Sequence, residues 1–177
     1  MLAPVADPVL RLAPFLGLII FLVGCTTGTS VDTTARDASV YQAVITDLGE
    51  RSGQSLDPGD GEVPVVFIET LGSDAIALET QVEVIAQLAE TYEIRFIDDL
   101  DEAVEIDVDG WPVRSNSLLI GLGPIQVDDK TEVRGEVYRR AGEIRAFRYS
   151  LVARTDGGWT LAGPPEEAEP EGFQPSP

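Results

Sequence analysis

Apolar residues recur along the chain with two spacings that predict its folded elements. Asp37 is suited to cap a helix, and the apolar positions that follow it form one helical stripe: Val40, Tyr41, Val44, Ile45 and Leu48. Residues 63–68 are almost entirely apolar, which is typical of a strand buried on both faces. A second helix is predicted to start at residues 72–74, with a core face at i, i+4, i+7, i+11 and i+14: Leu78, Val82, Ile85, Ala89 and Tyr92.

Another apolar run, residues 94–97, follows this helix and completes a strand–helix–strand unit. Such a unit over about 35 residues predicts a right-handed βαβ crossover. Further along, a strand is expected at 118–122, and apolar and polar residues alternate on both sides of an Ala141-Gly142 turn. Asp156-Gly157-Gly158 predicts a further hairpin. The predicted class is α+β, with a mixed sheet, an N-terminal helix, one βαβ unit and a C-terminal antiparallel meander.

The segments that flank this pattern lack apolar periodicity. Residues 25–36 are rich in Thr, Ser and Gly and are expected to form a flexible tether. Residues 164–177 contain five prolines and four glutamates, and this composition predicts a disordered tail. The predicted single domain therefore spans residues 37–163.

One long apolar run, Leu12–Gly24, ends in Leu22-Val23-Gly24-Cys25, and Cys25 is the only cysteine. The run has signal-peptide length and is shorter than the roughly 20 residues of a transmembrane helix. The four residues resemble the lipobox of bacterial lipoproteins. The resemblance implies that residues 1–24 are a signal peptide and that Cys25 carries a lipid anchor, with palmitate-like acyl chains, on the extracytoplasmic face of a membrane. The alternative is an uncleaved anchor with an ordinary thiol.

The charge of the chain limits its partners. A net charge of −19 repels nucleic acid and anionic headgroups, so no nucleic-acid partner is expected and the lipid on Cys25 must supply the attraction to the membrane. Residues 31–129 hold 22 acids and 4 arginines, whereas residues 130–154 hold seven bases and three acids. This basic segment either pairs with the acidic remainder or forms a site for an anionic ligand or acidic partner. Its candidate residues are Arg134, Arg139, Arg140, Arg145 and Arg148.

The catalytic inventory is small, because the chain has no histidine and its cysteine is assigned to lipidation. Histidine-dependent and thiol mechanisms are thereby excluded. A cluster of acids follows the strand at 94–97, where α/β proteins often place sites: Asp98, Asp99, Asp101 and Glu102. Two of these carboxylates could serve a glycosidase-like hydrolase. The same cluster could equally cap a following helix.

A calcium site is a further candidate. Glu105, Asp107 and Asp109 alternate before Gly110 in the manner of an EF-hand loop, but position 12 is Asn116 and not an acidic ligand. Asp107 and Asp109 therefore indicate at best a low-affinity calcium site. The alternative is a simple hairpin turn at 109–110 after a strand at 104–108.

Taken together, these patterns favour a non-enzymatic binding domain over an enzyme. The sequence predicts a lipid-anchored accessory domain of the bacterial cell envelope that binds an envelope protein or component, with no cofactor other than low-affinity calcium. The hydrolase that uses residues 98–102 is the alternative.

Overall fold

The computed structural model describes residues 33–53, 56 and 63–173. Its elements in chain order are α1 (Thr33–Arg51), β1 (Val65–Thr70), α2 (Leu78–Leu88), β2 (Glu93–Ile97), the 3₁₀ helix η2 (Leu100–Glu102), β3 (Ser117–Leu122), β4 (Gln126–Val127), β5 (Thr131–Arg140), β6 (Glu143–Ala153), β7 (Trp159–Leu161) and β8 (Glu166–Ala168). Within these ranges, no helix is both long enough and apolar enough to cross a membrane.

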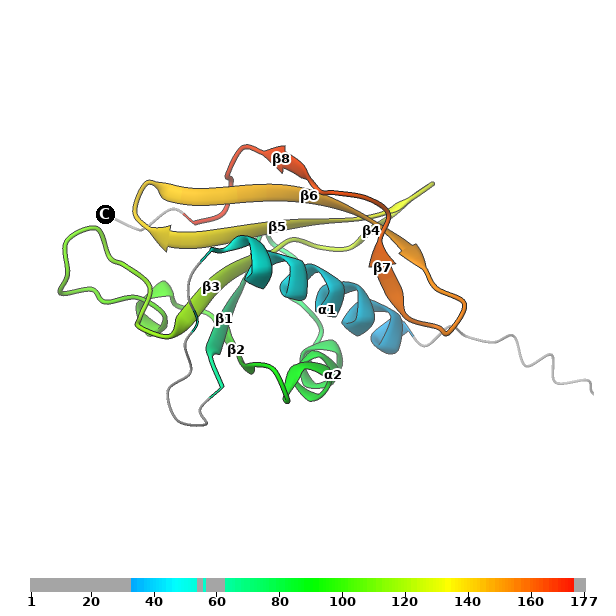
Figure 1. The fold of residues 1–177 in the computed structure, drawn as a ribbon, viewed down its shortest axis with the longest axis horizontal. Helices are drawn as coiled ribbons and strands as arrows, with labels where there is room; N and C mark the ends of the chain where they lie inside the picture. Colours follow the sequence, from blue (N-terminus) through cyan, green and yellow to red (C-terminus); the bar gives the residue numbers. More distant parts are fainter. Residues whose placement is uncertain (1–32, 54–55, 57–62, 174–177) are drawn as a thin grey trace, which may run out of the picture. The chain divides into compact units, whose positions relative to one another are not determined.

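The strands form one mixed sheet, which confirms the predicted α+β class (Figure 1). Its main path runs β2-β1-β3-β5-β6-β7, while β4 pairs with β5 and β8 pairs with β6. β1 is parallel to both β2 and β3, and the later pairs are antiparallel. The predicted βαβ unit is β1–α2–β2, and the predicted meander is β5–β6–β7.

The stripe predicted for the first helix is buried in α1, where Val40, Val44 and Leu48 are fully inaccessible. The start of the helix was predicted five residues too late, because α1 begins at Thr33 rather than after Asp37. The last residues of the predicted tether are therefore helical, and residues 25–32 lie outside the described ranges. The helix ends at Arg51, and Gly53 just beyond it adopts a positive φ of 58° that favours glycine.

The core face predicted for the second helix is wrong. α2 buries Thr80, Val84 and Leu88, whereas Leu78 and Val82 are 68% and 58% exposed. The helix also begins at Leu78, later than residues 72–74 predict. α2 carries two apolar stripes, and its contacts with α1 and β2 select the one that the sequence pattern did not favour.

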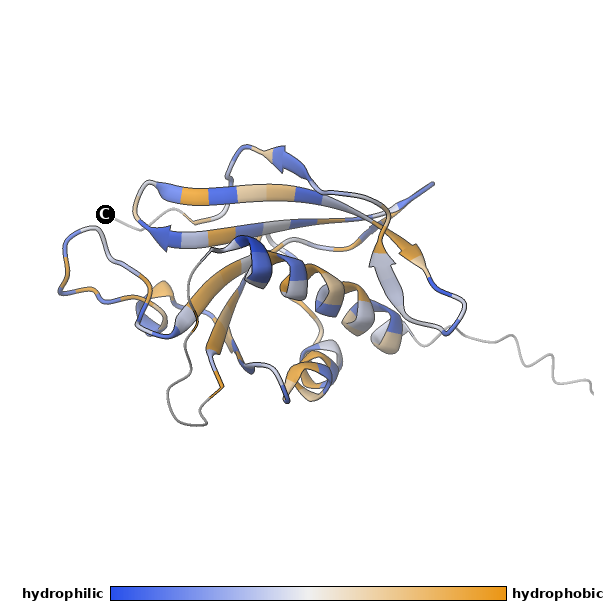
Figure 2. Ribbon diagram, in the orientation of Figure 1, coloured by the Kyte–Doolittle hydropathy of each residue, from blue (hydrophilic) through white to orange (hydrophobic). Residues whose placement is uncertain are grey.

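The two faces of the sheet are covered differently. The helix face carries the larger apolar core, in which Ile68 and Ile120 pack with the buried stripe of α1. The opposite face holds a smaller cluster with Phe67, Leu119 and Tyr138, to which the connection between β2 and β3 contributes. Figure 2 shows apolar residues running along β1 and β3, as expected for strands that are covered on both faces.

The prediction of a disordered tail from residue 164 is wrong as far as residue 173. β8 pairs with β6, and Phe173 is only 3% exposed, with its ring centroid 5.4 Å from that of Tyr138. We call residues 169–173 the strap, and the side of the sheet on which they lie the strap face. The Pro- and Glu-rich composition did not indicate two features that order this segment. Phe173 packs against Tyr138, and the edge of β6 beside β7 is free to pair with β8. Residues 174–177 lie outside the described ranges.

Candidate functional site

The structure places four of the five candidate arginines in two cavities. Arg139 and Arg145 line a cavity of about 360 Å³, while Arg134 and Arg148 line another of about 390 Å³. The second pair lies directly opposite each other on β5 and β6. Arg140 stands at the end of the hairpin, where it forms an ion pair with Glu143.

The first cavity lies where the C-terminal end of α1 meets the β5–β6 hairpin, and we call it the arginine cavity. It is lined by Arg51, Ser52, Val137, Arg139, Glu143, Ile144, Arg145 and Phe147. Three of these residues are basic and one is acidic, although the chain as a whole carries a net charge of −19. Val137, Ile144 and Phe147 supply apolar walls.

The guanidinium groups of this cavity are held by different partners. Arg51 pairs with Asp47, and Arg145 lies 3.0 Å from a carboxylate oxygen of Glu167. The guanidinium carbons of Arg51 and Arg145 lie 5.7 and 5.0 Å from the centroid of the Phe147 ring, within the range of cation–π interactions. One helix end and one strand thus direct positive charge at a single aromatic wall.

Arg139 differs from its two neighbours in having no carboxylate within ion-pair distance among the described residues. Its guanidinium donates instead to the backbone carbonyl of Ser52, just after α1. A cation is favoured there, because the carbonyl groups at the end of a helix carry partial negative charge. The pairing of β5 with β6 shifts register between Tyr138 and Arg140, so Arg139 occupies a bulge, a device that re-aims a side chain.

A buried hydrogen bond braces one side of the arginine cavity. The Tyr149 hydroxyl donates to Asp47 over 2.9 Å, and Asp47 also accepts from Arg51. Burial raises the pKa of Tyr149 well above its ordinary value, and the charge of Asp47 and this hydrogen bond raise it further. Tyr149 therefore remains a neutral donor that orients Asp47, and through it Arg51, over a wide pH range.

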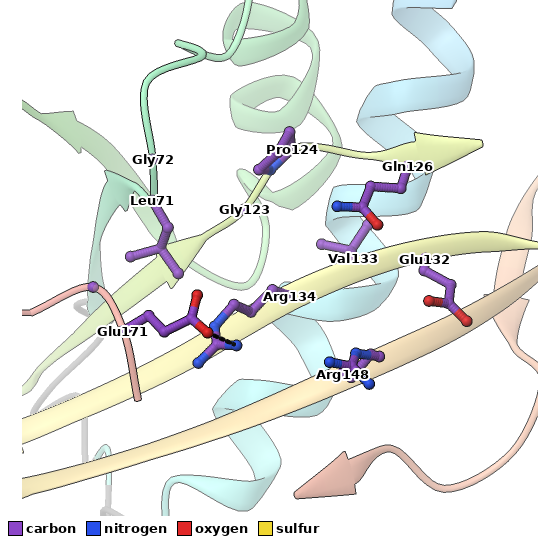
Figure 3. A pocket seen from close by; sticks show the side chains of 11 residues that line it. Leu71, Gly72, Gly123, Pro124, Gln126, Glu132, Val133, Arg134, Arg148 and Glu171 are labelled. Carbon is purple, nitrogen blue, oxygen red and sulfur yellow. Dashed lines mark ion pairs between the residues drawn. The ribbon is translucent and has the colours of Figure 1, made fainter. Parts of the chain in front are cut away.

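The second cavity, which we call the strap cavity, is more balanced in charge. Arg134, Arg148, Glu132 and Glu171 all line it, and Figure 3 shows the ion pair between Arg134 and Glu171. Arg148 forms no ion pair or side-chain hydrogen bond with the described residues. Like charges opposite each other in a ladder are unfavourable, and the two acids lining the cavity offset them.

Beneath the strap cavity, a fully buried carboxylate ties the strap to the sheet. Glu136 accepts from Arg134 Nε at 2.9 Å and from the backbone N–H groups of Glu171 and Gly172 at 2.9 and 3.2 Å. These charge-assisted hydrogen bonds satisfy a group that would otherwise be costly to bury. Arg134 is therefore engaged in holding the fold, which leaves the arginine cavity as the better candidate for ligand binding.

A second carboxylate on the same face is less well satisfied. Glu69 lies at the end of β1, and one of its carboxylate oxygens is buried without a hydrogen-bond partner among the described residues. Burial raises the pKa of Glu69, and the nearby charges of Glu136 and Asp99 raise it further. Gly121 of β3 is the register partner of both Glu69 and Glu136, so the two carboxylates flank it.

The acidic candidates for hydrolysis and calcium binding lie on exposed turns. Asp98, Asp99, Asp101 and Glu102 are all exposed around η2. The Asp99 carboxylate caps η2 by accepting from the Asp101 N–H at 3.0 Å. Helix capping was the alternative to a hydrolytic site in the interpretation of this cluster. Hydrolysis at these residues stays a prediction.

Asp107 and Asp109 are also exposed, in a loop that replaces the strand expected at 104–108. Only Val104 forms a bridge, to Val113, and Gly110 turns the chain with a φ of 80°. Among the described residues, no group of three or more acidic side chains is arranged to hold a metal ion. Weak calcium binding at Asp107 and Asp109 stays a prediction.

Sequence patterns missed two components of the arginine cavity, Arg51 and the Ser52 carbonyl. The sequence pattern predicts a helix that ends near these two residues. It does not predict that this end packs against the β5–β6 hairpin, because that is a tertiary contact. Phe147 lies on β6, one of the two strands on which alternation was predicted, but its contact with the two arginines was not predicted.

No protein-family model, curated protein or solved structure matches this chain. The two cavities are therefore compared by their own charge and geometry. The arginine cavity has an excess of basic groups and an apolar wall, whereas the lining of the strap cavity has equal numbers of basic and acidic groups.

Proposed function

We propose that this chain is a lipid-anchored accessory domain of the bacterial cell envelope, which binds an acidic side chain of a partner protein in the arginine cavity. The observation that carries the proposal is the convergence of Arg51, Arg139 and Arg145 on one apolar-walled cavity of a strongly acidic chain. Arginine binds carboxylates through paired, charge-assisted hydrogen bonds.

The cavity provides both a charged anchor and an apolar contact. Arg139 is the main anchor, because it has no carboxylate partner of its own among the described residues. Arg145 can exchange its exposed pair with Glu167 at little cost, since ion pairs between exposed groups contribute about 0–1 kcal/mol. Phe147 and Ile144 would contact the apolar part of the incoming segment.

A site-specific crosslink in cells tests the cavity. A photoreactive residue placed at Glu143, on the rim, should crosslink to one partner protein, and Arg139→Gln combined with Arg145→Gln should abolish that product. Arg154→Gln, which removes an exposed arginine on another hairpin, is the matched control and should leave the product unchanged. An undiminished crosslink in the double variant would contradict binding through the arginine cavity.

The lipid anchor is tested separately. The lipobox resemblance of Leu22–Cys25 supports it, and the wild-type chain should incorporate labelled palmitate and sediment with membranes. Cys25→Ser should lose the label and leave the membrane fraction. A Cys25→Ser chain that remains membrane-bound, or a wild-type chain without label, would contradict lipidation.

A further inference from the structure

We infer that the chain forms a symmetric dimer with a second copy of itself, through the free edge of β2 and the exposed apolar stripe of α2. This inference is independent of the ligand proposed for the arginine cavity, because β2 and α2 contribute no residue to that cavity.

The apolar stripe of α2 is the first observation. Leu78, Val82 and Ile85 lie at i, i+4 and i+7 on one face of the helix, and they are 68%, 58% and 40% exposed. α2 contacts α1 and β2 and buries Thr80, Val84 and Leu88, whereas the stripe stays exposed. Contiguous large apolar side chains on a helix face are typical of an interaction surface.

The second observation is that β2 ends the sheet beside α2. Among the described strands, β2 pairs only with β1. The Glu93 N–H donates inward to the Pro64 carbonyl at 3.0 Å, so by the alternation of a strand the N–H and C=O groups of Ile94 and Phe96 point to the free edge. An open edge of this kind is a template for another strand.

The phase of these groups allows a symmetric antiparallel pair with its two-fold axis at Ile94, Arg95 or Phe96, and the charges of the strand favour Ile94. With the two-fold axis at Ile94, the two Ile94 residues exchange N–H···O=C hydrogen bonds, and Phe96 N–H of one copy faces the Tyr92 carbonyl of the other. Both α2 helices then lie on the same face of the continuous sheet, next to the seam. The dimer has the isologous geometry that is commonest among soluble homo-oligomers.

The charges of β2 match this register and identify the occupant as a second copy. Charged residues normally discourage pairing at a sheet edge, but here Glu93 of each copy lies opposite Arg95 of the other, on the same face of the sheet. Within one chain the two groups already pair, with the Arg95 guanidinium 2.5 Å from a Glu93 oxygen. With the axis at Arg95 the two Arg95 residues face each other, and with the axis at Phe96 Glu93 faces Asp99, so both of these arrangements are repulsive.

Charge exchange tests the register directly, using the full chain in detergent solution. Arg95→Glu gives two acids per strand and Glu93→Arg gives two arginines, so each variant alone should self-associate about tenfold more weakly than wild type. An equimolar mixture of the two variants, labelled with different fluorophores, should recover energy transfer between unlike copies. A mixture that associates no better than either variant alone would overturn the proposed register.

The apolar stripe is tested by a substitution that spares the monomer. Val82→Glu should dissociate the dimer by sedimentation velocity while leaving the thermal transition of the monomer unchanged, because Val82 is exposed within one chain. Val127→Glu on β4, which is exposed to a similar 53%, is the matched control and should leave association unchanged. A wild-type chain that sediments as a monomer throughout, or a Val82→Glu dimer as stable as wild type, would overturn the inference.

Discussion

The helix face and the strap face of the sheet are stabilised by different chemistry, although the same strands contribute to both. On the helix face, Val44, Leu48 and Ile120 pack in an apolar core. On the strap face, Glu136 is buried at the centre and held by Arg134 and by strap N–H groups. Apolar packing is non-directional, whereas the buried ion requires specific partners. Substitutions on the two faces should therefore lower the free energy of unfolding by different amounts and through different interactions.

The largest effect is expected from the helix face. Leu48 is fully buried and packs over Gly135, where an added Cβ would come within 2.8 Å of a Leu48 methyl group. Leu48→Ala should lower the free energy of unfolding by about 2–5 kcal/mol, measured by urea denaturation. Val127→Ala, at an exposed site, should change it by less than about 0.5 kcal/mol. Equal losses in the two variants would contradict the assignment of the core.

A smaller loss is expected from the strap face. Glu136→Gln keeps the shape of the side chain but weakens its bonds to Arg134 and the strap, and it should cost about 2 kcal/mol. The backbone amides of Glu171 and Gly172 should exchange hydrogen faster in this variant. Glu132→Gln, four residues away on the same strand, is the control. Unchanged exchange at 171–172 would show that Glu136 does not hold the strap.

Two tyrosines, one on each face, sharpen the same contrast. The Tyr149 hydroxyl donates to the carboxylate of Asp47, whereas the Tyr138 hydroxyl donates to the Trp111 carbonyl, each over 2.9 Å. Tyr149→Phe should cost about 2 kcal/mol and Tyr138→Phe about 1 kcal/mol, because hydrogen bonds to charged groups contribute more. The measurement is again urea denaturation, and a larger loss in Tyr138→Phe would reverse the expected order.

The elements that the sequence predicted well are those with a single local periodicity. α1 has one apolar stripe, and β5 and β6 alternate on both sides of Ala141-Gly142, so their buried faces follow from spacing alone. α2 has two stripes, and only the position of α1 and β2 decides that Val84 rather than Val82 is buried. The spacing of apolar residues within α2 therefore cannot predict which of its two stripes is buried.

The candidate site was predictable only as a set of residue types. The excess of arginines in residues 130–154 was visible, but the face of each depends on the pleat and on the bulge at Arg139, which has no local signature. Arg51 joins the cavity from a helix that is distant in sequence. The strap was missed because Pro and Glu dominate its composition, while its order depends on Phe173 and on hydrogen bonds to Glu136.

The smallest predicted effect is a gain in stability, whereas the substitutions above all cause losses, and its size depends on pH. Glu69 is half-buried on the strap face, and one of its carboxylate oxygens is buried without the N–H donors that satisfy Glu136; its pKa is raised by burial first and then by the charges of Glu136 and Asp99. The folded chain therefore retains the Glu69 proton to a higher pH than the unfolded chain does. Its contribution to stability is fully present in acid and is lost as pH rises through the folded pKa, above the ordinary value of 4.5.

Glu69→Gln should remove this loss, because the amide stays neutral at every pH. The variant should match wild type in acid and become more stable by up to about 1 kcal/mol at neutral pH, measured as the difference in unfolding free energy across a pH series. Glu105→Gln, at an exposed site, should give a flat difference. A Glu69→Gln difference that is flat, or that favours wild type at neutral pH, would show that the strap face accommodates a second, half-buried carboxylate without cost. The proposed contrast would then lie only between apolar and polar burial, not between satisfied and unsatisfied ions.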